Sequence, residues 1–347
     1  MHAIAAQEID VLLAHVPARG DPFDHHALAK PGNVELLPLS HRLGWPLHAV
    51  HSNRIFFARL MRHVNWSELG AVFTRHLKLA RSLLERVPGL PLVYEAHEVF
   101  SETAPPARRE QIAALERLVV QGAAALVANS QATARRLTDR HAVTTPVHVI
   151  PNGVDYPPNV SERDWTRAAQ NVVYAGSFFG WKGVDDLVTA AATLPGFRVR
   201  LIGGDEASVA RLRAHARGDG AQLEFTGRVP HDSVARELET ACIAVLPNRA
   251  DTDSTFTSPI KLFEYMAAGC AIVASDIPAL REILDDADAL WVPPGQPQAL
   301  ADGIRALAES PAKARAMGAR VREKARRYTW HARGEKLAAV LKPLMTR

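Results

Sequence analysis

Short apolar runs alternate with segments of helical periodicity along the chain, and this alternation predicts a doubly wound α/β architecture. In the first half we expect strands at 9–15, 33–38, 71–74, 91–95, 125–128 and 147–150, with helices at 77–86, 108–121 and 132–140. A turn-rich stretch, Pro151-Asn152-Gly153 to Pro157-Pro158-Asn159, suits a domain boundary. Beyond it we expect strands at 171–175, 198–202, 223–225, 244–246 and 271–274, with helices at 184–193, 206–216, 233–239, 259–268 and 298–309. The pattern predicts two Rossmann-like domains facing an interdomain cleft, at 1–157 and 158–326, followed by a terminal segment at 327–347.

Length and composition support this picture. A chain of 347 residues suits two domains, and a charged fraction of 22% excludes a disordered or fibrous protein. Cys242 and Cys270 are too few for a disulfide framework or a zinc cage, so we expect a reducing compartment. The start resembles no signal peptide, and no run reaches the roughly 18 apolar residues of a membrane span. We therefore expect a soluble, cytoplasmic protein.

The segment 41–81 is basic and aromatic within a chain of net charge +4. Its arginines and lysines face a single acid, Glu68, and aromatic residues are interleaved with them. An anionic membrane surface or an acidic ligand would suit such a segment, and so would a solvated helix whose aromatic residues are simply core. Nucleic acid is not an expected partner, because no nucleic-acid motif accompanies the charge.

The segment Ser258-Pro-Ile-Lys-Leu-Phe-Glu-Tyr-Met-Ala-Ala-Gly269 is the most informative. Ser258 suits a helix N-cap, Pro259 suits the first helical position, and Lys261 and Glu264 follow on roughly one face. The free amides of this helix start and Lys261 would hold a phosphate, and the Glu264 carboxylate could accept a ribose diol. The alternative is a surface ion pair between Lys261 and Glu264.

Two further segments follow predicted strands, where doubly wound sheets bind ligands. In Tyr174-Ala-Gly-Ser-Phe-Phe-Gly-Trp-Lys-Gly183, glycines would admit a ligand and Lys182 would add a charge for a diphosphate. This is neither a Walker loop nor the dinucleotide fingerprint, which disfavours an NAD-dependent enzyme, and it could also be a plain glycine-rich turn. His97, in Val93-Tyr-Glu-Ala-His-Glu98, is a catalytic candidate by its position, although a lone histidine is more often structural.

Together the segments resemble those of the group 1 retaining glycosyltransferases, glycosyltransferase family 4, which have the GT-B fold of two Rossmann-like domains. The resemblance covers nearly the whole chain and rests on segments in the family's order: Tyr94-Glu-Ala-His-Glu98, Asn129-Ser130, Val149-Ile-Pro-Asn-Gly-Val-Asp155, Gly176–Gly183 and Ser258–Gly269 continued to Pro278. Arg327-Tyr-Thr-Trp330 also resembles the family's terminal helix, which crosses back onto the first domain.

The resemblance implies transfer of a sugar from a nucleotide diphosphate donor, with retention and with neither a cofactor nor an obligatory metal. Glu264 would hold the donor ribose, Lys182 and Lys261 the diphosphate, and His97 would lie beside the transferred sugar. Because the departing diphosphate gains negative charge, catalytic roles fall to His97, Lys182 and Lys261. The other expected donor-binding residues are Gly176, Ser177, Arg228, Val229, Thr257, Ser258, Ile260 and Leu262.

Three departures from the family pattern bear on this assignment. Phe256 stands where the family usually has a second glutamate, and Ser177 where it often has an arginine for the diphosphate. The chain also opens on what resembles the end of the first helix, so that 9–15 would be the second strand. The usual first strand and its glycine-rich loop are then missing, and we expect a start codon placed too late, with a truncated copy as the alternative.

The sequence thus predicts a glycosyltransferase that adds a sugar to a cell-surface glycan or a lipid-linked acceptor. The alternative is a catalytically inactive, truncated paralogue that binds nucleotide sugar or a partner transferase. An epimerase of the same architecture is disfavoured because its signature residues are not recognisable, and a phosphorylase would normally be much longer.

Overall fold

The computed structural model describes residues 1–17, 23, 29–42, 52–160, 162–216, 220–251 and 260–346. The chain divides into two compact units. Unit 1 comprises Met1–Asn129, Ala134–Ile150 and Trp330–Arg347, and unit 2 comprises Ser130–Thr133 and Pro151–Thr329. Each unit is built around parallel strands.

The strands of unit 1 form two separate sheets. One is the pair β1 (Val11–His15) and β2 (Val34–Pro38), and the other has the order β3 (Val72–Thr74), β4 (Leu92–Ala96), β5 (Ala125–Ala128), β6 (Val147–Val149). Within the described residues no hydrogen-bonded ladder joins these sheets, so the single sheet expected of a Rossmann-like domain is divided. Val11 of β1 and Phe73 of β3 pack against one hydrophobic cluster, so side chains rather than backbone hydrogen bonds link the two sheets.

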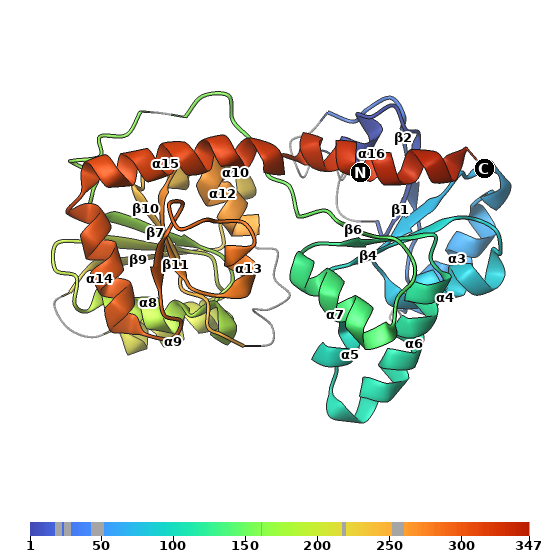
Figure 1. Ribbon diagram of the computed structural model, residues 1–347, viewed down its shortest axis with the longest axis horizontal. Helices are drawn as coiled ribbons and strands as arrows, with labels where there is room; N and C mark the ends of the chain where they lie inside the picture. The colour runs from blue at the N-terminus through green and yellow to red at the C-terminus, as the bar shows by residue number, and fades with distance from the viewer. Residues whose placement is uncertain are drawn as a thin grey trace. The chain divides into compact units, whose positions relative to one another are not determined.

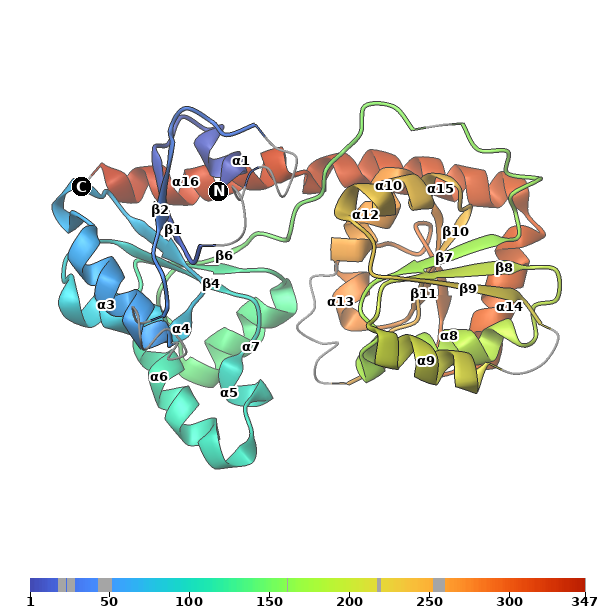
Figure 2. The same ribbon diagram turned by 180° about the vertical axis from the view of Figure 1, so that it is seen from behind.

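The helices of unit 1 cover both faces of the four-stranded sheet. α16 packs its apolar residues onto one face, and α4 and α6 lie against the other (Figures 1 and 2). β4 and β5 are wholly buried between these layers, as expected for parallel strands with a mainly apolar sequence. The described α-helices that lie wholly or mainly in unit 1 are α1 (His2–Ala5), α3 (Asn53–His63), α4 (Leu77–Arg86), α5 (Phe100–Thr103), α6 (Arg109–Gly122), α7 (Gln131–His141) and α16 (Trp330–Met345).

Unit 2 contains one parallel sheet with the strand order β12-β11-β10-β7-β8-β9. Its strands are β7 (Asn171–Ala175), β8 (Arg198–Ile202), β9 (Gln222–Gly227), β10 (Ile243–Leu246), β11 (Ala271–Ser275) and β12 (Leu290–Val292). The chain winds outward from β7 in one direction through β8 and β9, and then in the other from β10 to β12. The order therefore reverses between β7 and β10, which is the point where doubly wound sheets bind their ligands.

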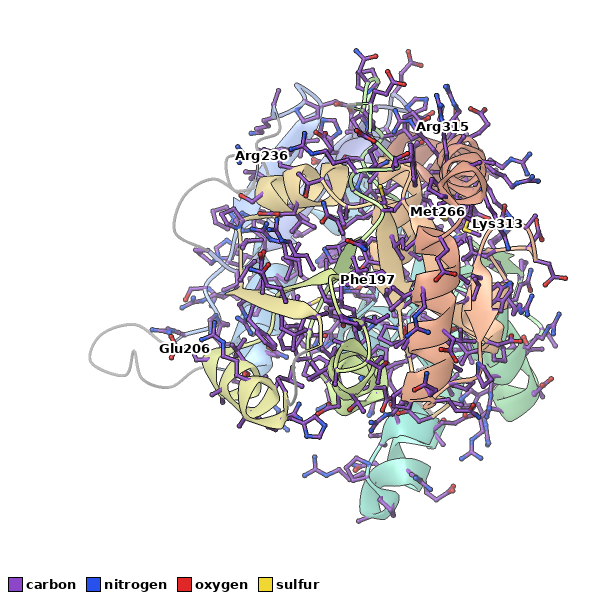
Figure 3. The ribbon with its side chains drawn as sticks, turned by 90° about the vertical axis from the view of Figure 1, so that its left-hand side faces the viewer. Phe197, Glu206, Arg236, Met266, Lys313 and Arg315 are labelled. Atoms are coloured by element: carbon purple, nitrogen blue, oxygen red, sulfur yellow. The ribbon has the colours of Figure 1, made fainter. Side chains whose placement is uncertain are left out.

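Two hydrophobic clusters fill the space between this sheet and its helices. α10, α12 and α13 contribute to one cluster and α8, α9 and α14 to the other, and α15 contributes to both (Figure 1). In Figure 3, Phe197 and Met266 lie in the interior, whereas Glu206, Arg236, Lys313 and Arg315 lie on the outside. The helices are α8 (Val184–Ala191), α9 (Glu206–His215), α10 (His231–Glu239), α12 (Ile260–Ala268), α13 (Pro278–Arg281), α14 (Pro297–Ala308) and α15 (Pro311–Ala325).

The pattern of apolar residues predicted most of these elements closely. The strands at 125–128, 171–175 and 198–202 and the helix at 77–86 are confirmed to the residue. α3, β12 and α15 were not predicted, although Pro311 at the first position of α15 is a helix-start signal. The expected helix start at Ser258 and Pro259 lies outside the described residues, and the described part of α12 begins at Ile260.

Candidate functional site

Loops from three neighbouring strands meet at the carboxyl edge of the unit 2 sheet. The Gly176 amide, directly after β7, donates to Ile202 O at 2.9 Å, and the Gly203 amide, after β8, donates to Gly227 O at 2.8 Å. The approach is too close for side chains, because a Cβ on Gly203 would lie 2.1 Å from Gly176 O. Glycine at these strand ends therefore leaves the backbone uncovered by side chains, and a ligand can approach such a backbone closely.

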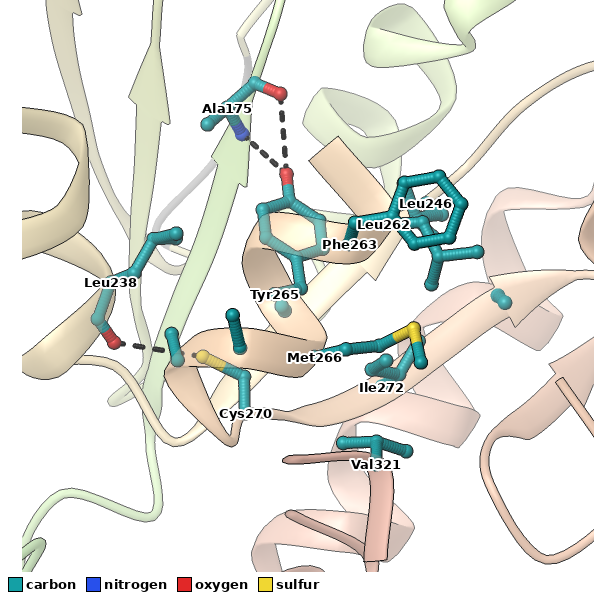
Figure 4. Close-up of a cluster of buried hydrophobic side chains, with 14 of the residues drawn as sticks. Ala175, Leu238, Leu246, Leu262, Phe263, Tyr265, Met266, Cys270, Ile272 and Val321 are labelled. Carbon is teal, nitrogen blue, oxygen red and sulfur yellow. Dashed lines mark hydrogen bonds between the residues drawn. The ribbon is translucent and has the colours of Figure 1, made fainter. Parts of the chain in front are cut away.

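α12 is fixed at the same edge by a buried tyrosine. Tyr265 Oη accepts from the Ala175 amide at 2.6 Å and lies 3.3 Å from Ala175 O, at the end of β7 (Figure 4). At the other end of α12, the Arg163 guanidinium donates to Ala268 O at 2.6 Å and Gly269 O at 2.9 Å. This cation satisfies helix carbonyls and complements the negative end of the helix dipole. The helix is thereby held rigidly beside β7.

Lys261 and Glu264 form the ion pair that the sequence left open as an alternative. Lys261 Nζ lies 3.0 Å from Glu264 Oε1 and 2.7 Å from Oε2. The Glu264 side chain is only 9% exposed and that of Lys261 30%. The carboxylate is thus deep and the ammonium shallower, so the pair presents a cation outward and an acceptor behind it.

Lys182 lies in the loop that follows β7, over the ring of Trp181. Its Nζ is 3.9 Å from the ring centroid, and burial lowers the pKa of Lys182 to about 8. No carboxylate pairs with it among the described residues. A buried ammonium without a counter-ion is costly, and an anionic ligand would relieve that cost.

The Lys182 loop is clamped to the loop after β10 by Arg249. The Arg249 guanidinium donates to both carboxylate oxygens of Asp186, at 2.8 Å and 2.7 Å, and its amide donates to Trp181 O at 2.9 Å. Gly183, at φ +67°, touches the same loop, since a Cβ there would lie 1.9 Å from Pro247 O. Two loops on either side of the reversal point are therefore joined into one surface.

Comparison with known proteins identifies the family. The model for "Glycosyltransferase Family 4" matches residues 1–156, and the model for "Glycosyl transferases group 1" matches residues 166–324. The chain belongs to glycosyltransferase family 4, group 1, and has the GT-B fold. The resemblance inferred from the sequence is thereby confirmed at the level of family and fold.

Named relatives and solved structures agree with this assignment. A phosphatidyl-myo-inositol mannosyltransferase of Mycobacterium tuberculosis is 30% identical over 194 residues, which cover 52% of this chain and 50% of that protein. A D-inositol 3-phosphate glycosyltransferase of Catenulispora acidiphila is 29% identical over 296 residues, covering 75% and 68%. The match to the mannosyltransferase thus spans about half of that protein's length.

Two solved structures share the fold at low sequence identity. Sucrose-phosphate synthase from Thermosynechococcus elongatus has a TM-score of 0.77 at 21% identity, covering 99% of this chain and 91% of its own. Anabaena HepE in complex with UDP and glucose has a TM-score of 0.71 at 15% identity, covering 96% and 99%. Both likenesses extend over almost the whole chain.

The remaining residues that the family resemblance suggested lie in different environments. Arg228 is exposed after β9, and Val229 packs against the cluster that contains α12. Ile260 is 41% exposed, whereas Leu262 is fully buried in that cluster, so the Leu262 side chain is not accessible to a ligand. Ser177 is half-buried, and its carbonyl accepts from Tyr174 Oη at 2.8 Å. Phe256, Thr257 and Ser258 lie outside the described residues.

His97 belongs to unit 1, where it follows β4 directly. The side-chain Nδ2 of Asn129, a residue that directly follows the neighbouring strand β5, donates to His97 O at 3.1 Å. His97 therefore lies at the carboxyl edge of its sheet, as the sequence predicted. Glu95 contacts His97, and Arg333 contacts Glu95. Neither Glu95 nor Arg333 was singled out from the sequence.

The basic segment separates into an inner aromatic part and an outer basic part. Phe56 and Trp66 pack against the cluster formed by Leu39, Leu60 and Val64. The exposed basic residues in the described part of this segment are Arg42, Arg54, Arg62, Arg75, Lys78 and Arg81. Residues 43–51, which include Trp45, lie outside the described residues. None of the helices among the described residues combines the length and apolar character needed to cross a bilayer.

The sequence also missed four polar or glycine positions in unit 2. Gly203 and Gly204 follow β8 at positive φ, and their adjacency directly after a strand is a signal that could have been read. Arg249 acts through Asp186, which no sequence pattern indicates. The Asn248 side chain, 1% exposed at the end of β10, has an amide nitrogen with no hydrogen-bond partner in the described part of the chain.

Proposed function

We propose that this chain is a retaining glycosyltransferase that moves a sugar from a nucleotide diphosphate sugar to a hydroxyl of a glycan or lipid-linked acceptor. The observation that carries the proposal is the set of groups at the reversal point of the unit 2 sheet. There, glycine backbone, the Lys261–Glu264 pair and Lys182, which has no carboxylate partner among the described residues, belong to loops and a helix that contact one another. Cations suit a diphosphate, and a deep carboxylate suits a ribose diol.

The proposed reaction exchanges one bond at the anomeric carbon of the sugar for another. The bond between the anomeric carbon and the diphosphate oxygen breaks, and its electron pair passes to the diphosphate. The acceptor oxygen bonds to the anomeric carbon on the same face, and its proton goes to the departing phosphate oxygen. Lys182 and Lys261 stabilise the growing negative charge, so the proposal includes neither a metal ion nor another cofactor.

The relatives support the choice of acceptor and donor class. The names of two relatives refer to phosphatidyl-myo-inositol and to inositol 3-phosphate, and one structural neighbour was crystallised with UDP and glucose. We therefore place a lipid-linked acceptor first, and a nucleoside diphosphate carrier for the donor.

Substitution of Glu264 separates recognition of the nucleoside from recognition of the diphosphate. Calorimetry with UDP, GDP and ADP should show selective binding of one nucleotide by the wild-type chain. Glu264→Ala should weaken that binding by about 1–3 kcal/mol, because the diol loses its acceptor. The same variant should bind inorganic pyrophosphate at least as well as wild type, because Lys261 is released from its partner.

Glu206→Ala, on the exposed side of α9, is the control and should bind nucleotide normally (Figure 3). Binding of no nucleotide by the wild-type chain would refute the donor site. Nucleotide-sugar binding with neither transfer nor hydrolysis would instead favour the inactive paralogue that binds nucleotide sugar.

We also propose that the exposed basic residues of α3 and α4 contact an anionic membrane surface. Each such residue near an anionic surface contributes about 1 kcal/mol. The triple variant Arg54→Gln, Arg62→Gln, Lys78→Gln should therefore lose co-sedimentation with phosphatidylglycerol vesicles at physiological salt. Lys313→Gln with Arg315→Gln, in unit 2, is the matched control (Figure 3). Equal binding to neutral phosphatidylcholine vesicles would contradict the proposal.

A further inference from the structure

His97 makes a contact that its sequence motif does not reveal. Its Nε2 lies 3.1 Å from Glu95 Oε1, at the end of β4. Nε2 is shielded from solvent and makes no hydrogen bond of normal geometry within the described residues, whereas 31% of the whole His97 side chain is exposed. One ring nitrogen thus lies at ion-pair distance from a buried carboxylate, and part of the ring surface remains open.

Arg333 of α16 holds this carboxylate in place. Its Nη2 donates to Glu95 Oε1, and its Nη1 donates to Ile150 O at 2.6 Å, directly after β6. The side chains of Arg333 and Glu95 are only 8% and 9% exposed. Arg333 therefore joins the carboxyl ends of β4 and β6, two strands that are not neighbours in the sheet.

The position of α16 explains how an arginine reaches this depth. Gly334, the next residue, packs against α1, and a Cβ there would lie 2.1 Å from Ala3 O. The close approach of the two helices brings the Arg333 side chain onto the sheet edge.

The charge state of Glu95 follows from these contacts. Burial alone would raise its pKa, but the close contact with His97 and the charge of Arg333 together lower the pKa below its ordinary value. Glu95 is therefore ionised at neutral pH. An ionised carboxylate can only accept hydrogen bonds, so a neutral imidazole beside it carries its proton on the nitrogen that faces it.

We infer that Glu95 and Arg333 are positioning residues that fix the His97 tautomer, with the proton on Nε2 and Nδ1 left as an acceptor for a substrate hydroxyl. The inference rests on the proposed function for its substrate, but the tautomer itself is a property of the free protein. The Asn129 contact to His97 O holds the backbone, so that both the ring and the chain are oriented. The same division of labour, in which a carboxylate orients a histidine, is general in enzymes.

Nitrogen-15 NMR of histidine-labelled full-length chain tests the tautomer directly. His97→Gln assigns the signal by its loss, and the wild type should show Nε2 protonated and Nδ1 unprotonated when the ring is neutral. Glu95→Gln should yield a mixture of tautomers, because an amide can either donate or accept. A wild-type ring protonated on Nδ1 would overturn the inference.

Turnover provides the second readout. Glu95→Gln should lower kcat by about tenfold or more and leave the Kd for UDP, GDP or ADP unchanged, because the nucleotide site is assigned to unit 2. The kcat of Arg333→Lys should lie between those of the wild type and Glu95→Gln, because lysine keeps the charge but loses the two-point contact. If Glu95→Gln fails to fold, Arg333→Lys tests the positioning role in its place. Glu98→Gln is the matched control: Glu98 accepts from Thr103 Oγ1 at 2.7 Å and should show wild-type kcat and tautomer.

The outcomes separate this inference from the proposed function. An unchanged kcat and tautomer in Glu95→Gln, or equal losses in Glu98→Gln, would overturn the positioning role. Absence of nucleotide binding and transfer in the wild type would overturn the proposed function, and the tautomer measurement would still decide the arrangement of Glu95 and His97.

Discussion

Replacing Lys182 with methionine should lower kcat for sugar transfer by about 10²–10³-fold, the usual loss when one preorganised group that stabilises developing charge is removed. Lys182 has no carboxylate partner among the described residues, so its charge is available to the departing diphosphate. Lys182→Arg keeps a cation and should retain more activity than methionine. Steady-state kinetics of all three proteins, with nucleotide binding measured in parallel, would test this expectation.

The pH dependence of binding gives a sharper test, because burial lowers the pKa of Lys182 to about 8 in the free protein. A bound diphosphate favours the charged lysine and raises that pKa, so binding takes up a proton whenever the free lysine is neutral. Below pH 8 the lysine is already charged, and affinity should not depend on its titration. Above pH 8 affinity should fall with each pH unit, by up to tenfold.

Lys182→Arg should remove this loss of affinity, because arginine stays charged throughout the range. Calorimetry of UDP, GDP and ADP between pH 7 and 10, in buffers of different ionisation enthalpy, measures both the affinity and the proton uptake. Identical pH profiles for wild type and Lys182→Arg would show that Lys182 does not bind the diphosphate.

A single added methyl group at Gly183 should strongly weaken nucleotide binding. Gly183 has φ +67°, which costs an alanine about 1 kcal/mol or more, and its Cβ would lie 1.9 Å from Pro247 O. The loop that carries Lys182 must then move away from the loop that carries Arg249. We expect Gly183→Ala to lower nucleotide affinity at least tenfold and to lower the melting temperature.

Gly180→Ala is the matched control in the same loop, three residues earlier. No atom lies within 4 Å of a Cβ built there, and its backbone is not in the left-handed region. It should bind nucleotide like the wild type. If both variants lose affinity equally, general loop sensitivity rather than the contact with Pro247 would account for the effect.

The local features of the site were predictable because they are written in short stretches of sequence. The apolar runs of β7, β8 and β10 predict buried parallel strands, and Gly176–Gly183 and Ser258–Gly269 mark the loop and helix that follow them. His97 was placed by the same rule, at the end of β4. Periodicity, turn residues and helix-start residues act over a few positions, so one chain is enough to read them.

Tertiary structure decided which groups share a partner. It paired Lys261 with Glu264, left Lys182 over Trp181, and clamped two loops through Arg249 and Asp186. It divided the unit 1 strands into two sheets, and it brought Arg333 to Glu95 across 238 positions of sequence. A hydrogen-bond pattern between strands and a contact between distant side chains depend on how whole elements pack. The sequence by itself therefore determined the elements and the residue types at their ends, and only packing determined the charge partners that set the chemistry of those residues.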